Sequence, residues 1–458
     1  CKRLKGNPSM KVFKVGFIAL TKASWATPEI DNLRKTMLAS LKTLPYEIVA
    51  DDSLTTTAAE ASALCADLRK QDVSAVIVFM ATFPVGAIVP VIAKELPVPV
   101  VLISTPEKPQ ANRMWTQNSF CGSNMAVHTL RQLGRKNTFV FGPAEQAGEL
   151  VKRPLEILKC VSDLAAGKVG LVGGRVPGFY TSNCDEMRLR AKLGTEIEII
   201  DLLEIVDTAK KLSEAEVKQG VDTVRKTAAV CAKTIEKDIE PAGRMYASFR
   251  KTAKKYALSA YAIRCWPEWS DIYGIAPCAV IGMLNNDRLV SSCEGDVLGA
   301  VLMQIEASLS GGIPFFADLI SFDYDQDTAV LWHCGAAPSA ICRKFEETTL
   351  SQHFRVDGGN KKGLTNEFSM KAGPITLAQL DEDGDGYRML IAKGTALDTE
   401  PFIRGNPLNV RFDCTAERLV NTIMTEGFKH HYSIIHADIE NDLLELCRWL
   451  DIKPVLVK

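Results

Sequence analysis

Short apolar runs alternate with helical patterns over the first third of the chain. Apolar runs lie at residues 12–20 and 98–104, and Thr27 followed by Pro28 is a typical start of a helix. Short strands joined by helices pair in parallel through right-handed crossovers. The pattern therefore predicts a doubly wound α/β domain over residues 1–166.

A second set of strand and helix patterns begins at Lys168 and predicts a central α/β domain over residues 167–340. Beyond it helical patterns become sparse. Alternating runs such as 387–391 and 408–412 predict antiparallel strands in a β-rich domain over residues 341–458. The predicted fold class is α/β, with two doubly wound parallel-sheet domains followed by a β-rich C-terminal domain.

Three segments imitate functional motifs. Residues 73–93 carry no charge over about the length of a membrane span, but Pro84 and Gly86 interrupt them, so we expect a buried strand, a loop and a helix. The glycines within 170–174 lack the G-x-G-x-x-G spacing, which favours a tight turn over a nucleotide site. Residues 381–387 begin like an EF-hand loop without its final Glu, so a solvated hairpin turn is expected.

Charge and cysteine content narrow the range of partners and compartments. The 458 residues include 54 basic and 55 acidic side chains without a basic cluster, so nucleic acid is not an expected partner. A membrane is not expected either, because the apolar segment at 73–93 is interrupted. The 13 cysteines are scattered, without the CxxC or Cys/His spacings typical of zinc sites. Cysteines of this kind are typical of reduced thiols, so we expect a cytoplasmic protein.

A few histidines and carboxylates are the candidate catalytic and metal-binding residues. The chain has six histidines, of which His430 and His431 are adjacent where a loop enters a strand pattern, and His333 ends another strand pattern. Glu294 is either a functional carboxylate or a charge at a helix N-terminus. Asp318 interrupts an apolar run, either as a functional carboxylate or as a loop residue between strands. A buried carboxylate needs a partner or a cation.

Several short motifs are informative as an ordered set. They are Cys265-Trp266-Pro267, Ala276-Pro277-Cys278, Cys293-Glu294-Gly295-Asp296, the run around Asp318, His333-Cys334-Gly335, and Gly427 followed by His430-His431. Together they resemble the L-fucose/L-arabinose isomerase superfamily. The Glu-then-Asp order is similar to the fucose isomerases, whereas His333 and the histidine pair are similar to the arabinose isomerases.

The resemblance implies a metal-dependent aldose–ketose isomerase, fucose isomerase-like, with catalytic Mn²⁺ or another divalent metal held by Glu294, Asp318 and His431. Coordination polarises the carbonyl of an open-chain aldose and acidifies its C2 proton. One carboxylate then takes this proton, and the other group returns it to C1 through a cis-enediol. Either Glu294 or Asp318 can be the base. His333 either binds the metal or contacts the substrate.

The resemblance also implies contacts with a sugar and with other subunits. We expect substrate contacts from His333, His430, Asn118, Trp266 and Phe83; Phe83 follows a strand pattern, where α/β sheets bind ligands. A neighbouring subunit's first domain completes the site in this superfamily, which implies a homo-oligomer, a trimer or hexamer with sites at its interfaces. The alternatives are an isomerase that converts an anionic sugar such as sulfoquinovose to sulfofructose, a non-catalytic sugar-binding protein, and a metal-dependent lyase.

Overall fold

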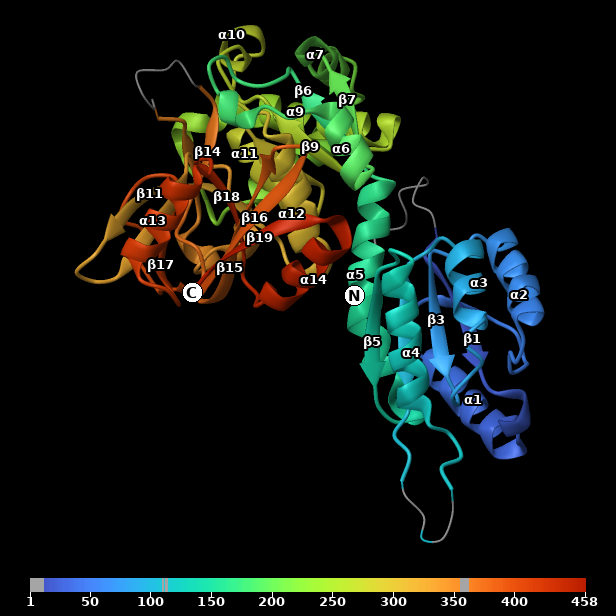
Figure 1. Cartoon of the computed structure of the whole chain (residues 1–458). Coiled ribbons are helices and arrows are strands. Elements are labelled where there is room, and N and C mark those ends of the chain that lie inside the picture. The colour runs from blue at the N-terminus through green and yellow to red at the C-terminus, as the bar shows by residue number, and fades with distance from the viewer. Residues whose placement is uncertain (1–11, 109–110, 112–113, 355–361) are drawn as a thin grey trace. The chain divides into compact units, whose positions relative to one another are not determined.

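A computed structural model describes residues 12–108, 111, 114–354 and 362–458 (Figure 1). The described chain divides into two compact units, one formed by residues 11–162 and the other by residues 163–458.

The unit of residues 11–162 is built on a parallel sheet. Its described strands run in the order β2-β1-β3-β4-β5, so the chain starts in the interior of the sheet and winds to both sides. The strands are β1 (Lys14–Leu20), β2 (Glu47–Ala50), β3 (Ala75–Met80), β4 (Val100–Ser104) and β5 (Asn137–Phe141). The helices are α1 (Pro28–Leu41), α2 (Ala58–Lys70), α3 (Ile88–Glu95), α4 (Ser119–Gln132) and α5 (Ala147–Ala165).

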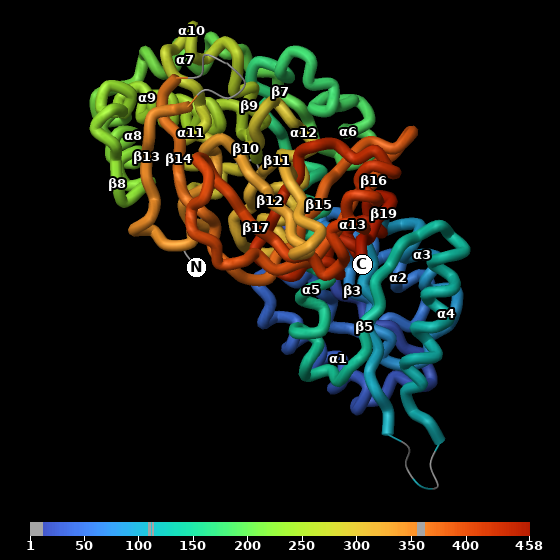
Figure 2. Tube along the Cα trace, turned by 90° about the vertical axis from the view of Figure 1, so that its left-hand side faces the viewer, coloured from blue at the N-terminus to red at the C-terminus, as the bar shows by residue number. Residues whose placement is uncertain are grey.

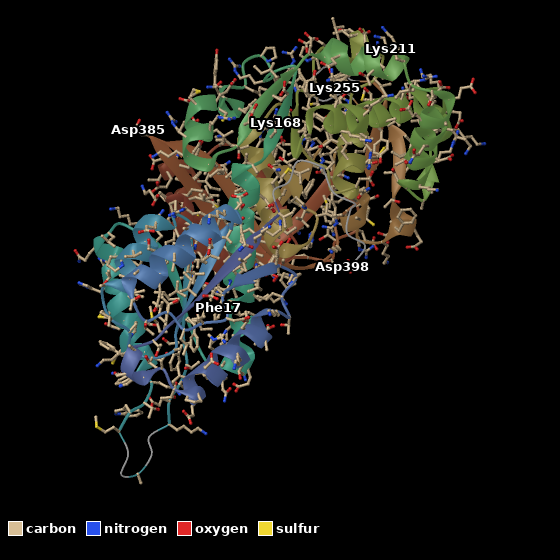
Figure 3. The ribbon with its side chains drawn as sticks, turned by 90° about the vertical axis from the view of Figure 1, so that its right-hand side faces the viewer. Phe17, Lys168, Lys211, Lys255, Asp385 and Asp398 are labelled. Atoms are coloured by element: carbon tan, nitrogen blue, oxygen red, sulfur yellow. The ribbon has the colours of Figure 1, made fainter. Side chains whose placement is uncertain are left out.

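Two local predictions for this unit are confirmed. The side chain of Thr27 caps α1 by accepting a hydrogen bond from the backbone of Ile30, with Pro28 in the first helical position. Residues 73–93 form the buried strand β3, a loop and the start of α3, and Phe17 on the neighbouring strand β1 is 1 % exposed (Figure 3). Among the described helices none is both long and apolar enough to span a bilayer.

A second parallel sheet opens the unit of residues 163–458. Its described strands run in the order β10-β9-β6-β7. Lys168, labelled in Figure 3, starts β6 and pairs with Glu196 and Glu198 on β7. The strands are β6 (Lys168–Val172), β7 (Glu196–Ile200), β9 (Ala260–Ile263) and β10 (Val290–Cys293). The helices are α6 (Glu186–Leu193), α7 (Leu202–Lys210), α8 (Glu214–Lys226), α9 (Glu236–Tyr256), α10 (Trp269–Ile272), α11 (Cys278–Asn286) and α12 (Val297–Ser310).

The same unit contains a mainly antiparallel barrel. Its strands follow the order β15-β18-β11-β12-β17-β16, and pairing of β16 with β15 closes the ring, while β19 adds to β16 in parallel. Figure 2 labels β11, β12, β15, β16, β17 and β19 of this barrel. The strands are β11 (Phe315–Asp323), β12 (Thr328–His333), β15 (Gly373–Asp383), β16 (Gly386–Ala396), β17 (Asn406–Phe412), β18 (His431–Ile435) and β19 (Ile452–Val457). The helices α13 (Ala416–Glu426) and α14 (Glu440–Leu450) lie between these last strands in the chain.

The predicted fold class is confirmed: parallel α/β sheets precede a β-rich C-terminal region. The hairpin predicted at 381–387 is also confirmed, because Gly384 and Asp385 form the turn between β15 and β16 (Figure 3). Residues 315–333, which the predicted boundary at 340 assigns to the central domain, form two strands of the barrel. The predicted boundaries after residues 166 and 340 stay predictions. A small sheet of β8 (Val230–Cys231), β13 (Thr349–Gln352) and β14 (Leu364–Glu367) joins distant segments of this unit.

Candidate active site

The first carboxylate of the candidate site stands in the turn that follows β10. Glu294 has a φ of +60° and Gly295 a φ of +72°, so both adopt the left-handed conformation. A Cβ atom on Gly295 would lie 2.5 Å from the carbonyl oxygen of Gly174, in the tight glycine turn after β6. The missing side chain lets the turns after two strands of the parallel sheet touch, and this contact holds Glu294 at the carboxyl edge of that sheet.

The second carboxylate and the histidine lie opposite each other on neighbouring barrel strands. Asp318 on β11 is the register partner of His431 on β18, which places their Cβ atoms about 4.5–5.5 Å apart. Their strand neighbours Ala317, Leu319 and Tyr432 pack on the barrel core, so Asp318 and His431 project from the outer face. Asp318 lies within a strand, which excludes the alternative that it is a loop residue.

Helix α12 connects these two layers, because it starts directly after the Glu294 turn and packs on β11. The contact is close: a side chain on Gly299 in the first turn of α12 would collide with the ring of Phe316 on β11. Phe316 lies under His431, with the ring centroids 4.8 Å apart. The close approach of helix and strand brings the carboxyl edge of the parallel sheet to the outer face of the barrel.

His431 is held by carboxylates from the parallel-sheet layer. Its Nε2 atom lies 2.8 Å from Oε2 of Glu294 and 3.8 Å from Oδ1 of Asp318. Its Nδ1 atom lies 3.0 Å from Oδ2 of Asp296, the N-cap residue of α12, whose Oδ1 accepts from the backbone of Gly299 at 2.8 Å. Because Asp296 accepts the Nδ1 proton, Nε2 is the ring atom that faces the other two carboxylates.

The groups around Nε2 suit a divalent cation. Oδ1 of Asp318 is buried and has no hydrogen-bond partner among the described residues, which is costly unless a cation compensates. Glu294, His430 and His431 each offer a ligand atom, and these three atoms lie within 4.8 Å of one another. Carboxylate oxygens and imidazole nitrogens both occur as ligands of divalent first-row metals. A carboxylate such as Asp296 behind the histidine is the usual support of a metal-binding imidazole.

Burial and charge shift several pKa values in this cluster. Burial raises the pKa of Asp296, but the charge of Lys429 and the hydrogen bond with His431 outweigh it and lower the value to about 2. Burial lowers the pKa of His431, but its hydrogen bonds to Asp296 and Glu294 raise it to about 10. The pKa of Asp318 is raised, chiefly by burial. Without a metal, His431 is therefore an imidazolium, with a proton on each ring nitrogen and a carboxylate beside each.

Aromatic rings line one side of the cluster. Nε1 of Trp266 donates to Oε1 of Glu294 at 3.2 Å. Phe179 meets both Trp266 and His430 edge to face, with centroids 5.6 Å apart in each pair. The ring of His430 lies on that of His431, with centroids 4.0 Å apart. Ring faces beside polar atoms form a surface that can hold the apolar and hydroxyl faces of a sugar.

His333 ends β12 and is buried near the same carboxylates. The backbone N–H of Cys334 donates to its Nδ1 atom at 2.9 Å, which leaves Nε2 as the nitrogen that carries the proton. Burial lowers the pKa of His333, but Cys334, Asp318 and Glu294 together raise it to about 9, so Nε2 keeps its proton. The structure thus brings together six of the predicted site residues: Glu294, Asp318, His431, His430, Trp266 and His333.

Comparisons with known proteins identify the family of the chain. Residues 16–163 match the N-terminal domain of fucose/sulfoquinovose isomerases, and residues 331–457 match the C-terminal domain of L-fucose isomerase. A sulfoquinovose isomerase of Alkalicoccus urumqiensis is 30% identical over 403 residues, which cover 86% of this chain and 89% of the relative. The chain belongs to the fucose isomerase-like family. It is an aldose–ketose isomerase of sugars, and its family is metal-dependent.

Another relative and one solved structure complete the comparison. The sulfoquinovose isomerase of Priestia aryabhattai is 28% identical over 409 residues, which cover 89% of this chain and 90% of the relative. An ABC transporter solute-binding protein of Burkholderia multivorans aligns with 65% of this chain and 93% of its own at 12% identity. Its TM-score of 0.19 is too low to bear on the fold of the isomerase.

Two predicted substrate contacts of the isomerase, Phe83 and Asn118, lie in the unit of residues 11–162. Phe83 follows β3, and its backbone N–H donates to Gln117 at 2.8 Å, next to Asn118. Asn118 precedes α4 with a φ of +52°, and Glu107 accepts its backbone N–H at 2.9 Å. The two residues therefore lie together at the carboxyl edge of their own sheet, and their contact with substrate stays a prediction.

Some site residues of the isomerase were missed by the sequence reasoning. Asp296 lies in the Cys293-Glu294-Gly295-Asp296 motif, and an Asp before an apolar helical run is a signal for an N-cap. Phe179 and Thr181 follow the glycine turn after β6 and belong to no recognisable sequence motif. The ring of Phe179 contacts that of His430, and the hydroxyl of Thr181 lies 3.3 Å from Nδ1 of His430. Lys429, beside the histidine pair, lowers the pKa of Asp296 through space. Such through-space relations leave no spacing signal in the sequence.

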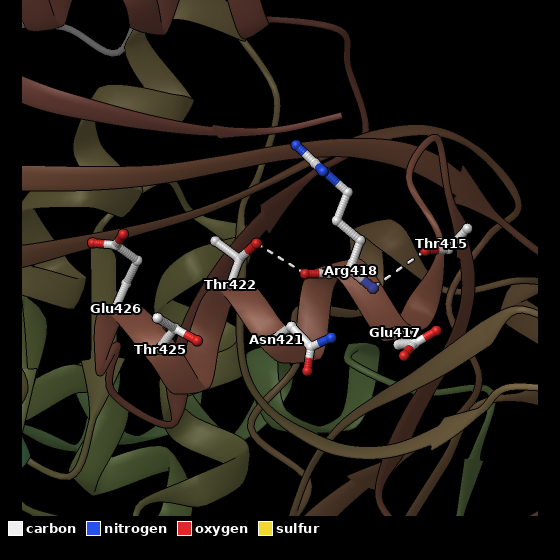
Figure 4. Close-up of a pocket in the computed structure, with 7 residues that line it drawn as sticks. All are labelled: Thr415, Glu417, Arg418, Asn421, Thr422, Thr425 and Glu426. Atoms are coloured by element: carbon white, nitrogen blue, oxygen red, sulfur yellow. Dashed lines mark hydrogen bonds between the residues drawn. The ribbon is translucent and has the colours of Figure 1, made fainter.

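A polar pocket along α13 of the isomerase is lined by other residues than the candidate active site. Figure 4 shows its lining, in which Thr422 donates to the carbonyl of Arg418, and the Arg418 backbone donates to Thr415. The full lining is Thr415, Glu417, Arg418, Asn421, Thr422, Thr425 and Glu426. It includes none of the predicted site residues, so it does not bear on the isomerase chemistry.

Proposed function

We propose that this isomerase converts sulfoquinovose, a sulfonated hexose, to its ketose at a Mn²⁺ site held by Glu294, Asp318 and His431. The metal site is supported by one observation above all: Nε2 of His431 faces both carboxylates while Asp296 holds the other ring nitrogen. The substrate is supported by the relatives, which are sulfoquinovose isomerases.

When bound, the divalent ion would polarise the carbonyl and the adjacent hydroxyl of the open-chain sugar and so acidify the C2 proton. We assign Asp318 as the residue that takes this proton, since Nε1 of Trp266 donates to Oε1 of Glu294 and leaves one oxygen of that carboxylate for the ion, whereas Oδ1 of Asp318 has no donor among the described residues. Asp318 then returns the proton to C1 of the cis-enediol. His333, with its proton on Nε2, donates to a substrate oxygen and so steadies the charge that develops there.

Arg175 supplies a positive charge for the sulfonate. A Cβ atom on Gly295 would lie 2.9 Å from Cα of Arg175, so this arginine stands beside the Glu294 turn. Its guanidinium lies over the ring of Tyr180, 5.0 Å from the centroid. A guanidinium can donate two parallel hydrogen bonds to an oxyanion, which gives both charge and geometry for recognition of a sulfonate.

Substrate choice is tested with purified protein, Mn²⁺ and a panel of aldoses that includes sulfoquinovose, L-fucose and D-arabinose, with ketose formation followed by NMR. We expect the highest kcat/KM for sulfoquinovose. Loss of a hydrogen bond to a charged group costs about 1.5–3 kcal/mol, so Arg175→Gln should lower that kcat/KM at least about tenfold and leave neutral sugars unaffected. Arg190→Gln, which removes an exposed arginine that pairs with Glu196, is the matched control.

The outcomes separate the parts of this proposal. Turnover of no aldose would overturn the assigned active site. A preference for L-fucose that Arg175→Gln leaves unchanged would overturn sulfoquinovose as the substrate. Exchange of the C2 hydrogen with deuterated solvent that persists in Asp318→Asn would overturn Asp318 as the base.

We also propose that the enzyme is a homo-oligomer, a trimer or hexamer, with substrate contacts shared between subunits. Support comes from three exposed rings on α4 and β5: Phe120, Phe139 and Phe141 are 54%, 36% and 48% exposed and contact one another. Exposed apolar patches of this kind mark interfaces. Sedimentation gives the subunit number, and mixed oligomers of Glu294→Gln and Asn118→Ala subunits should regain activity if sites are shared. A fully active monomer would overturn the proposal.

A further inference from the structure

A cluster of two thiols and one imidazole lies in the unit of residues 163–458, and it shares no residue with the carboxylate site. Cys278 begins α11, Cys334 follows β12, and His353 follows β13. Their exposed fractions are 0%, 5% and 7%. Each offers one ligand atom, and these three atoms lie within 4.8 Å of one another. The chain therefore brings three soft or borderline metal ligands from distant segments into one buried place.

Two of the three distances between the ligand atoms match those of a tetrahedral zinc ion. The two Sγ atoms are 3.9 Å apart, and Nε2 of His353 lies 3.4 Å from Sγ of Cys278. Zn–S bonds of about 2.3 Å and Zn–N bonds of about 2.1 Å with tetrahedral angles require S···S of about 3.8 Å and N···S of about 3.6 Å. The same 3.9 Å is about twice the S–S bond length of about 2.05 Å, so the two thiols are not joined in a disulfide.

His353 is oriented for a ligand role. Its Nδ1 atom lies 2.6 Å from the carbonyl oxygen of Phe354, so Nδ1 donates its proton there and Nε2 keeps its lone pair toward the thiols. Its backbone N–H donates to Gly363 at 2.8 Å, which fixes the position of the residue. A carbonyl behind the imidazole is one of the usual supports of a metal-binding histidine.

The surroundings suit a thiolate pair neutralised by a cation. Cys278 is the first residue of α11, where the helix dipole favours a thiolate. Ala276 belongs to the same buried cluster as the two cysteines, and Trp332 and Phe354 pack against it. Two buried thiolates would be costly alone, whereas two thiolates with a divalent ion carry no net charge.

We infer that Cys278, Cys334 and His353 form a second metal site, which binds Zn²⁺ and ties the start of α11 to the ends of β12 and β13. Three protein ligands with water in the fourth position is a known zinc arrangement. The ligands of this site are softer than those of the carboxylate cluster. Soft thiolates select zinc over manganese, whereas carboxylates suit manganese. Cys334 also donates its backbone N–H to His333, so the ion would hold the strand end that carries this histidine.

The test uses the full chain, stripped with a chelator under reducing conditions and loaded with Co²⁺ as a spectroscopic probe for Zn²⁺. We expect one bound Co²⁺ per chain to show thiolate-to-cobalt charge-transfer absorption that excess Mn²⁺ does not remove. The absorption should persist in Glu294→Gln, which disturbs only the carboxylate site. It should vanish in Cys278→Ser, together with one zinc per chain in elemental analysis.

Cys65→Ser removes a fully buried thiol in the other unit and is the matched control, which should keep both the absorption and the zinc. If Cys278→Ser fails to fold, the wild-type spectrum alone still decides. Absence of thiolate-to-cobalt absorption in the reduced wild type would overturn the inference. So would absorption that survives in both Cys278→Ser and Cys334→Ser.

Discussion

Replacing Asp296 by Asn tests whether the carboxylate behind His431 prepares this histidine as a metal ligand. The two oxygens of Asp296 have different tasks, since Oδ1 accepts from the backbone of Gly299 and Oδ2 accepts from Nδ1 of His431. Asn has a single oxygen, and Asn is as good an N-cap as Asp. If that oxygen keeps the cap, the amide nitrogen faces Nδ1 and donates to it. The ring proton then moves to Nε2, and the atom that faces Glu294 can no longer bind a metal.

The expected cost follows from this change of tautomer. Loss of a supporting partner of a metal-binding histidine typically lowers metal affinity about 10–100-fold, which corresponds to about 1.4–2.7 kcal/mol. The fold should tolerate Asp296→Asn, because the cap on α12 is retained. Asp296→Ala should lose the cap as well, at an additional cost of about 1 kcal/mol in the free energy of unfolding.

The assay is a calorimetric titration of the chelator-stripped protein with Mn²⁺, together with urea unfolding of each variant. Asp201→Asn is the control, because Asp201 caps α7 by accepting from the backbone of Leu203 and has no histidine partner among the described residues. We expect weaker Mn²⁺ binding in Asp296→Asn and unchanged binding in Asp201→Asn. Wild-type affinity in Asp296→Asn would refute the role of Asp296 in orienting His431.

Three further predictions concern protons and backbone. His431, with a pKa raised to about 10, must lose a proton when a metal binds, so Mn²⁺ affinity should rise about tenfold per pH unit below that value, with proton release in calorimetry. Gly295→Ala should lower the free energy of unfolding by at least about 1–3 kcal/mol, and by more than Gly134→Ala, which has a φ of +65° but open space around it. Burial raises the pKa of Glu306 well above its ordinary 4.5, so the folded protein keeps a proton that the unfolded chain loses above pH 4.5. Wild-type stability in urea should therefore fall relative to Glu306→Gln as the pH rises from 5 to 8, and an equal pH dependence would contradict this.

Much of the fold follows from local patterns in the sequence. The capped start of α1, the buried strand β3 and the turn at Gly384 and Asp385 each depend on a few neighbouring residues, and the structure confirms them. The barrel membership of β11 and β12 cannot be predicted in this way, because their partners β18 and β17 lie 73 to 119 residues further along the chain. An apolar run predicts a strand but does not say which sheet the strand joins.

The site shows the same division between local and long-range information. Asp318 stands out because it interrupts an apolar run, Glu294 because it lies where an apolar strand meets a helix, and His431 because it belongs to an adjacent histidine pair. Their meeting depends on contacts such as that between Glu294 and His431, 137 residues apart. The thiol–imidazole cluster has no zinc spacing in the sequence for the same reason, since Cys278 and His353 are 75 residues apart.

The ladder between β11 and β18 is the step that turns these separate residues into a site. Side chains alternate between the two faces of a strand, so a shift of one residue in the pairing would turn His431 into the barrel core and Tyr432 out toward Glu294. The apolar residues that alternate with Asp318 and His431 oppose this shift, because it would expose them and bury charge. The barrel core thereby keeps Asp318 and His431 together on the outer face, where α12 brings the two carboxylates of the Glu294 turn to meet them.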